Sequence, residues 1–161
     1  MKDPQQRRFL GYRILGVFNN FIAVLFLFSV IVNFGAVGFY PPLLLPLFIA
    51  FSILIYTNLS AVFARQVLLD RKPLKHRLKD WIKVNAYVTL IYSAFQFALL
   101  LIALLGTTLI EKLGSNFGVP AGTIRGMVIF LMGSSILFIV HVILTFRYLR
   151  SFKDYFQHPP Q

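Results

Sequence analysis

Long stretches without a charged side chain dominate the sequence. Residues 14–64 form a run of 51 uncharged positions, residues 84–110 a run of 27, and residues 126–146 a run of 21. A transmembrane helix needs about 20 apolar residues to cross roughly 30 Å of hydrocarbon. The two shorter runs therefore each predict one membrane-spanning helix, and the first run is long enough for two.

One strong turn signal divides the first run. It lies at 38–42 and ends in Pro41-Pro42, which cannot continue a helix because proline lacks the backbone N–H. A soluble four-helix bundle is excluded because it would need a polar stripe on every helix, whereas residues 22–32 contain only Ser29 as a polar residue. We therefore predict an all-α polytopic membrane protein, with four transmembrane helices in two helical hairpins. The expected elements of this single domain, residues 1–161, are helices at about 14–37, 43–63, 84–105 and 126–146, a basic loop at 65–83 and an outer loop at 106–125.

The distribution of basic residues predicts the orientation. The chain has 16 Lys and Arg against 5 Asp and Glu, for a net charge of +11. Fourteen of the basic residues precede the first helix, lie in the loop at 65–83 or follow the fourth helix, and only Lys112 and Arg125 fall on the other side. By the positive-inside rule both termini face the cytoplasm. The compact loops favour a bacterial inner membrane.

A cleavable signal peptide is the competing interpretation of the first helix. Ala36, Val37 and Gly38 are similar to a small-residue cleavage site. The apolar stretch before them has about 24 residues, whereas the core of a signal peptide has about 7–15. A retained membrane helix is therefore the favoured interpretation.

The helices on the basic side are expected to continue beyond the apolar runs. Helix two can extend to Leu69, and Pro73 suits the first turn of a new helix that carries Trp81 to the membrane interface. On the other side, Gly114, Gly118, Gly122 and Gly126 are spaced by four, as in closely packed membrane helices. Pro120 interrupts that run, so we predict a flexible outer loop.

Polar side chains inside the four helices are the candidates for a site. None of the helices contains Asp, Glu, Lys or Arg, and one polar residue from each, namely Asn20, Asn58, Thr89 and His141, lies five or six residues inside the basic end. At 1.5 Å per residue they share a layer about 8–9 Å deep. The full set, with its neighbours along the helices, is Asn19, Asn20, Asn58, Asn85, Thr89, Tyr92, Gln96 and His141. Two interpretations stay open: hydrogen bonds of about 0.6 kcal/mol that hold helices together, or a pocket open to the cytoplasm that binds a small ligand or a lipid headgroup.

The loop at 65–83 is a second candidate for binding. Its basic residues are Arg65, Arg71, Lys72, Lys75, Arg77, Lys79 and Lys83. They can simply enforce the topology, or they can dock anionic lipid at about 1 kcal/mol per charge or an acidic protein partner. Nucleic-acid binding is not expected, because no recognised module accompanies the charge.

Catalysis is not expected. The sequence has no cysteine, no His-Glu pair at metal-binding spacing, no nucleophile-elbow motif and no phosphate-binding loop. His76 and His158 are too distant from His141 to complete a metal site, and no cofactor is expected. The favoured function is a non-catalytic accessory or interaction subunit, whose partners are membrane lipids and either further copies of the chain or another membrane protein. The alternative is a small transporter or channel subunit that uses the polar pocket.

Overall fold

The protein is almost entirely helical. The computed structural model describes residues 9–38 and 40–157. Its long helices are α2 (Leu10–Val37), α3 (Leu44–Phe63), α4 (His76–Leu105) and α6 (Ala121–Ser151). The shorter elements are the turn η1 (Pro41–Leu43), the π-helix η2 (Ala64–Leu69), the helix α5 (Thr107–Phe117), the turn η3 (Lys153–Tyr155) and the two-residue strands β1 (Leu74–Lys75) and β2 (Phe156–Gln157).

Four helices are long and apolar enough to cross a membrane, which confirms the number expected from the sequence. They correspond to α2, η1–α3–η2, α4 and α6, and contain 27 to 31 residues each within the part of the chain that the structure describes. Large apolar side chains stay exposed on their outer surfaces, for example Phe28, Ile91 and Leu105 at 65%, 69% and 76%. Exposure on this scale is not typical of a soluble protein, and a multi-pass membrane protein accounts for it.

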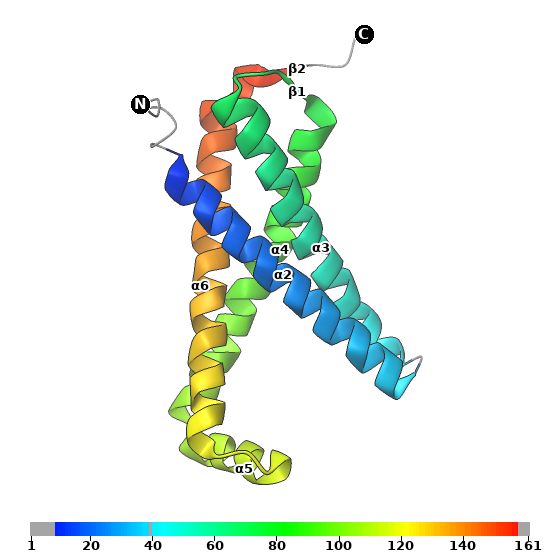
Figure 1. The fold of residues 1–161 in the computed structure, drawn as a ribbon, viewed down its shortest axis with the longest axis vertical. Coiled ribbons are helices and arrows are strands. Elements are labelled where there is room, and N and C mark those ends of the chain that lie inside the picture. The colour runs from blue at the N-terminus through cyan, green and yellow to red at the C-terminus, as the bar shows by residue number, and fades with distance from the viewer. Residues whose placement is uncertain (1–8, 39, 158–161) are drawn as a thin grey trace.

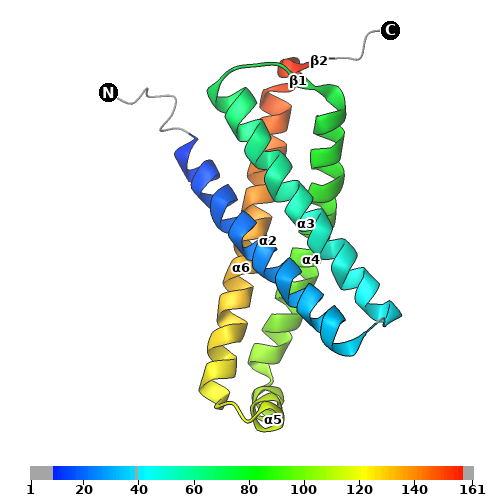
Figure 2. The ribbon, with the colours of Figure 1, turned by 45° about the vertical axis from the view of Figure 1, so that its right-hand side comes forward.

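The four long helices form a ring in which each makes its most extensive contacts with two others. The order around the ring is α2, α3, α4, α6, and the contact that closes it, between α2 and α6, is the smallest. Figures 1 and 2 show that the α2–α3 pair crosses the α4–α6 pair and that the two pairs diverge toward α5. The opposite end, where both strands and both described chain ends lie, is called the terminal end below. Packing between the pairs is therefore concentrated toward the terminal end.

The expected extensions on the terminal side are present. The helix begun by α3 continues as η2 to Leu69 and ends at Asp70, as the sequence predicts. The next helix starts only at His76, so the prediction that Pro73 lies in its first turn is wrong, because Leu74 and Lys75 form strand β1 between them. Most of the expected loop at 65–83 is therefore helical, and only the segment around Pro73 is extended.

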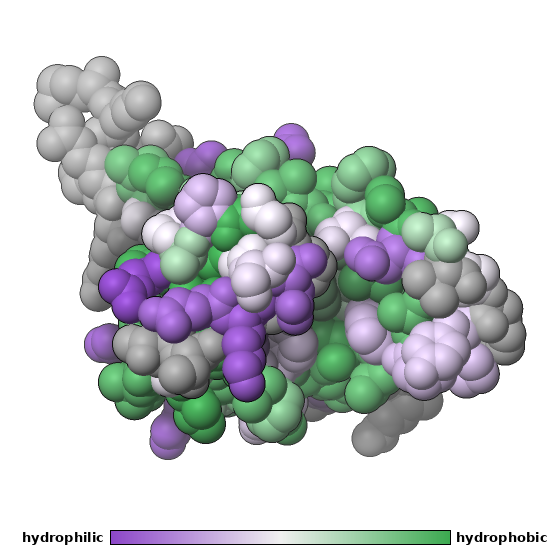
Figure 3. Space-filling view, turned by 90° about the horizontal axis from the view of Figure 1, so that it is seen from below, coloured by the Kyte–Doolittle hydropathy of each residue, from purple (hydrophilic) through white to green (hydrophobic). Residues whose placement is uncertain are grey.

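The outer loop at 106–125 differs from the flexible loop that the sequence predicted, because α5 occupies much of it. Gly118 ends α5 in the left-handed conformation, at φ 62°, and the amide of Val119 donates to the carbonyl of Gly114 at 2.9 Å. A Cβ at Gly114 would lie 2.8 Å from the Val119 carbonyl oxygen. These two glycines therefore allow α5 to end in a tight turn. Figure 3, which views the molecule from the α5 end, shows hydrophilic surface gathered there.

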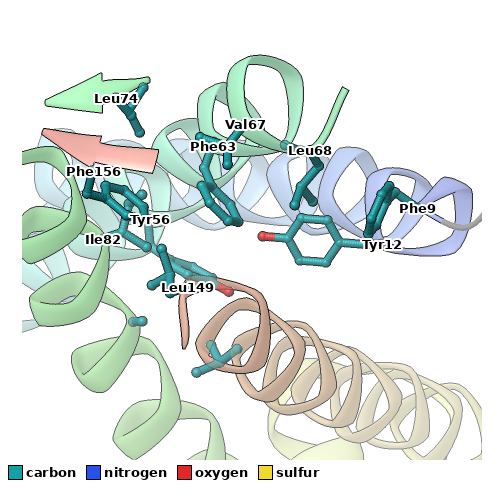
Figure 4. Packing of buried hydrophobic residues seen from close by; sticks show 13 residues of the cluster. Phe9, Tyr12, Tyr56, Phe63, Val67, Leu68, Leu74, Ile82, Leu149 and Phe156 are labelled. Carbon is teal, nitrogen blue, oxygen red and sulfur yellow. The ribbon is translucent and has the colours of Figure 1, made fainter. Parts of the chain in front are cut away.

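The largest group of buried apolar residues lies at the terminal end. Phe63, which has no exposed surface, stacks on Phe156 with ring centroids 6.0 Å apart. Phe156 belongs to β2, which pairs in parallel with β1 and so joins the end of the chain to the segment before α4. Figure 4 shows Phe9, Tyr12 and Leu68 in the same cluster. The cluster fixes α2, α3, η2 and α6 around the site described next.

Candidate functional site

A cavity of about 490 Å³ lies between α2, α3, η2 and α6 toward the terminal end. Its wall combines apolar, polar and charged side chains. The residues that line it are Tyr12, Arg13, Gly16, Val17, Asn20, Ser60, Ala61, Ala64, Arg65, Leu69, Asp70 and His141. We call it the α2–α3–α6 pocket.

His141 is the polar centre of the pocket wall. The side chain is only 1% exposed, and its Nδ1 lies 2.8 Å from the hydroxyl of Tyr56. That hydroxyl also contacts Thr145 Oγ1 at 2.8 Å, and the hydroxyl of Tyr12 contacts the same Thr145 oxygen at 2.9 Å. The ring of Tyr12 stacks on the imidazole with centroids 4.6 Å apart. Three helices thus hold one imidazole.

Counting protons in this network assigns the tautomer of His141. Thr145 has one hydroxyl proton, which it donates to the backbone carbonyl of His141 at 2.8 Å. In the arrangement that makes all four contacts of the network hydrogen bonds at once, its oxygen accepts from both Tyr12 and Tyr56. Since Tyr56 then has no proton left, the hydrogen bond at 2.8 Å between Tyr56 and His141 must be donated by Nδ1–H. In the neutral ring Nε2 is consequently an acceptor.

Nε2 of His141 is buried and has no hydrogen-bond partner. A Cβ built on Gly16 would lie 3.2 Å from it, so a side chain at residue 16 would press on the imidazole. Because Gly16 and His141 both line the pocket, the glycine keeps this part of the wall open. A buried polar atom without a partner is rare in folded proteins and calls for an explanation.

Charged side chains surround the rest of the pocket. Arg13 and Arg65 are its two basic residues, and they are also the residues that bound the uncharged run at 14–64. Asp70 is its one acidic residue, and its carboxylate lies 3.9 Å from Lys72 Nζ. The two arginines therefore lie where α2 and the α3–η2 helix reach the edge of the apolar layer.

The π-helix η2 forms one side of the pocket. It contributes Ala64, Arg65 and Leu69, and its widened turn is marked by the bond from the Asp70 amide to the Arg65 carbonyl at 3.1 Å. Arg71 follows in the left-handed conformation at φ 54°, with its guanidinium 5.3 Å from the ring centre of Phe152. π-helical turns are rare and frequent at functional sites, and positive φ is uncommon outside glycine.

The structure brings only part of the predicted polar layer into the pocket. Asn20 and His141 line it, and Asn20 accepts a hydrogen bond from Thr57 at 2.9 Å. Asn19 is fully buried beside the pocket, where its Nδ2 donates to the Leu137 carbonyl at 3.3 Å and its Oδ1 has no partner. Asn58 lies outside the pocket because its exposed side chain donates to the Leu54 carbonyl of its own helix at 2.8 Å.

The predicted residues on α4 also lie outside the pocket. Asn85 donates to the Trp81 carbonyl and Thr89 donates to the Asn85 carbonyl, both within the helix at 2.8 Å. Tyr92 stacks on Phe26 of α2 with ring centroids 5.5 Å apart, and Gln96 is half-buried. These side chains serve helix packing and not the pocket lining.

Sequence reasoning missed Tyr12, Gly16 and Arg13 as pocket residues. Tyr12 and Arg13 lie before residue 14, where the first helix was expected to begin, and glycine carries no chemical signal by itself. The spacing could have revealed them, because Tyr12, Gly16, Asn19 and Asn20 follow the i, i+4 and i+3 positions of one helix face. This helix face crosses residue 14, the helix start that charge alone predicts.

The predicted basic residues gather at the terminal end. Among the seven, Arg65 lines the pocket, and Lys79 lies with its Nζ 5.2 Å from the ring centre of Phe156. Arg71, Lys72, Lys75 and Arg77 are exposed, and Lys79 and Lys83 are half-buried. Within residues 9–38 and 40–157, no group of three or more His, Asp or Glu side chains forms a metal-binding cluster.

Comparison with other proteins assigns no family. No family model matches the chain, and no curated protein and no solved structure shows significant similarity to it. The functional argument therefore rests on the pocket and on the distribution of charge.

Proposed function

We propose that this is a non-catalytic membrane protein that acts by binding a small ligand in the α2–α3–α6 pocket. One observation carries the proposal: the buried, unpartnered Nε2 of His141 lies in the wall of a cavity large enough for a ligand. As an acceptor, Nε2 is suited to a ligand hydroxyl or N–H. Binding is favoured over transport because the described lining residues all come from the terminal half of their helices.

We further propose that the pocket and both termini face the cytoplasm of a bacterial cell, since fourteen of the sixteen basic residues lie on that side. Because the chain has no cysteine, single cysteines can report sidedness. In intact cells an impermeant maleimide is expected to label Tyr40→Cys and to spare Lys75→Cys. In lysed cells the maleimide should label both cysteines. Labelling of position 75 but not position 40 in intact cells would invert the orientation.

The pocket itself is tested by filling it. Gly16→Leu is expected to remove any small molecule that co-purifies with the protein, because the leucine would occupy the space beside His141 Nε2. Gly11→Leu is the matched control on the same helix, because nothing lies within 4 Å of a Cβ at Gly11. Native mass spectrometry of both variants, checked for folding by circular dichroism, gives the result. An unchanged set of bound molecules in Gly16→Leu would contradict the proposed function.

A second candidate function is docking of an anionic partner at the terminal end, as an accessory subunit. The observation in its favour is the exposed basic surface of Lys72, Lys75 and Arg77 beside β2. The same purification separates the two functions. If Gly16→Leu changes nothing, while a co-purifying protein is lost when these three residues are replaced by serine, docking is the better supported function.

A further inference from the structure

A second, apolar hollow adjoins the α2–α3–α6 pocket on the outer face of α2. It has a volume of about 550 Å³ and is lined by Leu10, Arg13, Ile14, Val17, Phe18 and Phe21. Arg13 and Val17 line both hollows, so the two lie side by side along α2. Val17 and Phe21 are 72% and 60% exposed, on a helix apolar enough to span a membrane. A hydrocarbon chain that follows α2 would cover this hollow.

The point where the two hollows meet is basic. Arg13 borders both, and Arg65 faces the pocket from η2. Both residues stand at the boundary of the uncharged run, where we place the lipid phosphates. Arginine binds phosphate oxygens through its planar fork of N–H groups. With Asp70, the charged lining residues carry a net charge of +1, which suits a singly charged phosphodiester.

The unpartnered acceptor lies just below this level. Gly16 follows Arg13 by three residues, which is about 4.5 Å along the helix axis, and His141 Nε2 lies against Gly16. A ligand hydroxyl that donates a hydrogen bond to Nε2 would therefore be attached to an atom close to the phosphate. That atom lies on the side of the phosphate that faces the membrane interior. In a glycerophospholipid that atom is the central glycerol carbon, which bears a free hydroxyl only when the second acyl chain is absent.

We infer that the α2–α3–α6 pocket binds a lysophospholipid, with its phosphate between Arg13 and Arg65, its free glycerol hydroxyl toward His141 Nε2 and its single acyl chain along the α2 hollow. This inference rests on the proposed function and names the class of ligand. A free phosphate ester would leave the apolar hollow uncovered. A diacyl phospholipid has no hydroxyl on the membrane side of its phosphate, and an ionised fatty acid has no proton to donate to Nε2.

Three probes test the acyl chain, the free hydroxyl and the phosphate of this ligand separately. They are 1-oleoyl-lysophosphatidylglycerol, its analogue with the central hydroxyl methylated, and glycerol phosphate without a chain. With the full chain purified in dodecyl maltoside and titrated by native mass spectrometry, we expect the lysophospholipid to bind most tightly. The methylated analogue should bind about fivefold more weakly, the loss of one neutral hydrogen bond. Glycerol phosphate should not bind measurably.

Variants of the two pocket arginines test the phosphate site. Arg13→Gln and Arg65→Gln are each expected to weaken lysophospholipid binding about tenfold or more, because each removes a charge-assisted hydrogen bond. Arg147→Gln, at an exposed arginine of α6 that does not line the pocket, should leave it unchanged. Circular dichroism verifies that all three variants fold. Unchanged binding in both pocket variants would overturn the phosphate assignment.

The remaining outcomes also decide the inference. Equal affinity for the methylated analogue would overturn the hydroxyl assignment without the need for a variant at His141. Tight binding of glycerol phosphate would indicate a soluble anion in place of a lipid. If the lysophospholipid does not bind, but Gly16→Leu still removes another bound molecule, only this inference fails. If Gly16→Leu has no effect either, the proposed function fails as well.

Discussion

Phe63→Ala is expected to lower the free energy of unfolding by about 3–5 kcal/mol, as for other buried phenylalanines. Phe63 has no exposed surface and stacks on Phe156 in the terminal-end cluster shown in Figure 4. Shortening it leaves a void lined by side chains that lose their dispersion contacts. The measurement is reversible unfolding in mixed micelles, with the helical signal in circular dichroism as the readout.

Phe48→Ala is the matched control for this effect. Phe48 lies on the same helix, α3, but 59% of its side chain is exposed. A lipid or detergent chain can fill the space that its ring leaves, so we expect a change within about 0.5 kcal/mol. Equal destabilisation by the two variants would mean that the terminal-end cluster is not the packed core that fixes the site.

Tyr56→Phe is expected to destabilise the protein by about 1–3 kcal/mol, because it leaves a buried hydrogen-bond donor unpaired. The hydroxyl of Tyr56 accepts from His141 Nδ1–H and donates to Thr145, and the side chain has no exposed surface. Without it, both nitrogens of His141 lack partners. This loss exceeds the average of about 0.6 kcal/mol for polar contacts in membranes, because Nδ1–H belongs to a side chain that is only 1% exposed.

Tyr87→Phe serves as the control, because the ring of Tyr87 packs on Phe146 while more than half of the side chain is exposed. Its unfolding midpoint should match that of the unmodified protein. Combining Tyr56→Phe with Tyr12→Phe gives a further test. Both hydroxyls contact the same Thr145 oxygen, so their effects should not add. Additive losses would contradict the shared acceptor and the tautomer assigned from it.

The membrane helices could be predicted from sequence because the cost of placing charge or unpaired backbone in hydrocarbon is local. Every interruption of the apolar pattern, from the prolines at 41–42 to the charges that follow Ala64, is visible in the chain itself. The ends of the helices were harder to predict from the sequence. Phe9 and Tyr12 belong to the terminal-end cluster, so α2 begins at Leu10, before the uncharged run that starts at residue 14.

The candidate site could be predicted only in part, because depth in the membrane and direction around a helix are separate quantities. Asn58 and His141 lie at similar depth by residue count, yet Asn58 faces outward and donates to its own helix. Thr89 shares that depth and bonds within α4. Depth follows from counting residues, whereas direction depends on which helices are neighbours.

Sequence alone determined that the chain has four membrane-spanning helices and where its basic charge accumulates. Tertiary structure alone decided that α2, α3 and α6 surround one imidazole, that its unpartnered Nε2 lies against Gly16, and that η2 brings Arg65 to the same pocket as Arg13. The reason is physical. Transfer into lipid depends on the composition of a segment, whereas a binding site depends on side chains from distant segments that meet in one hydrogen-bond network.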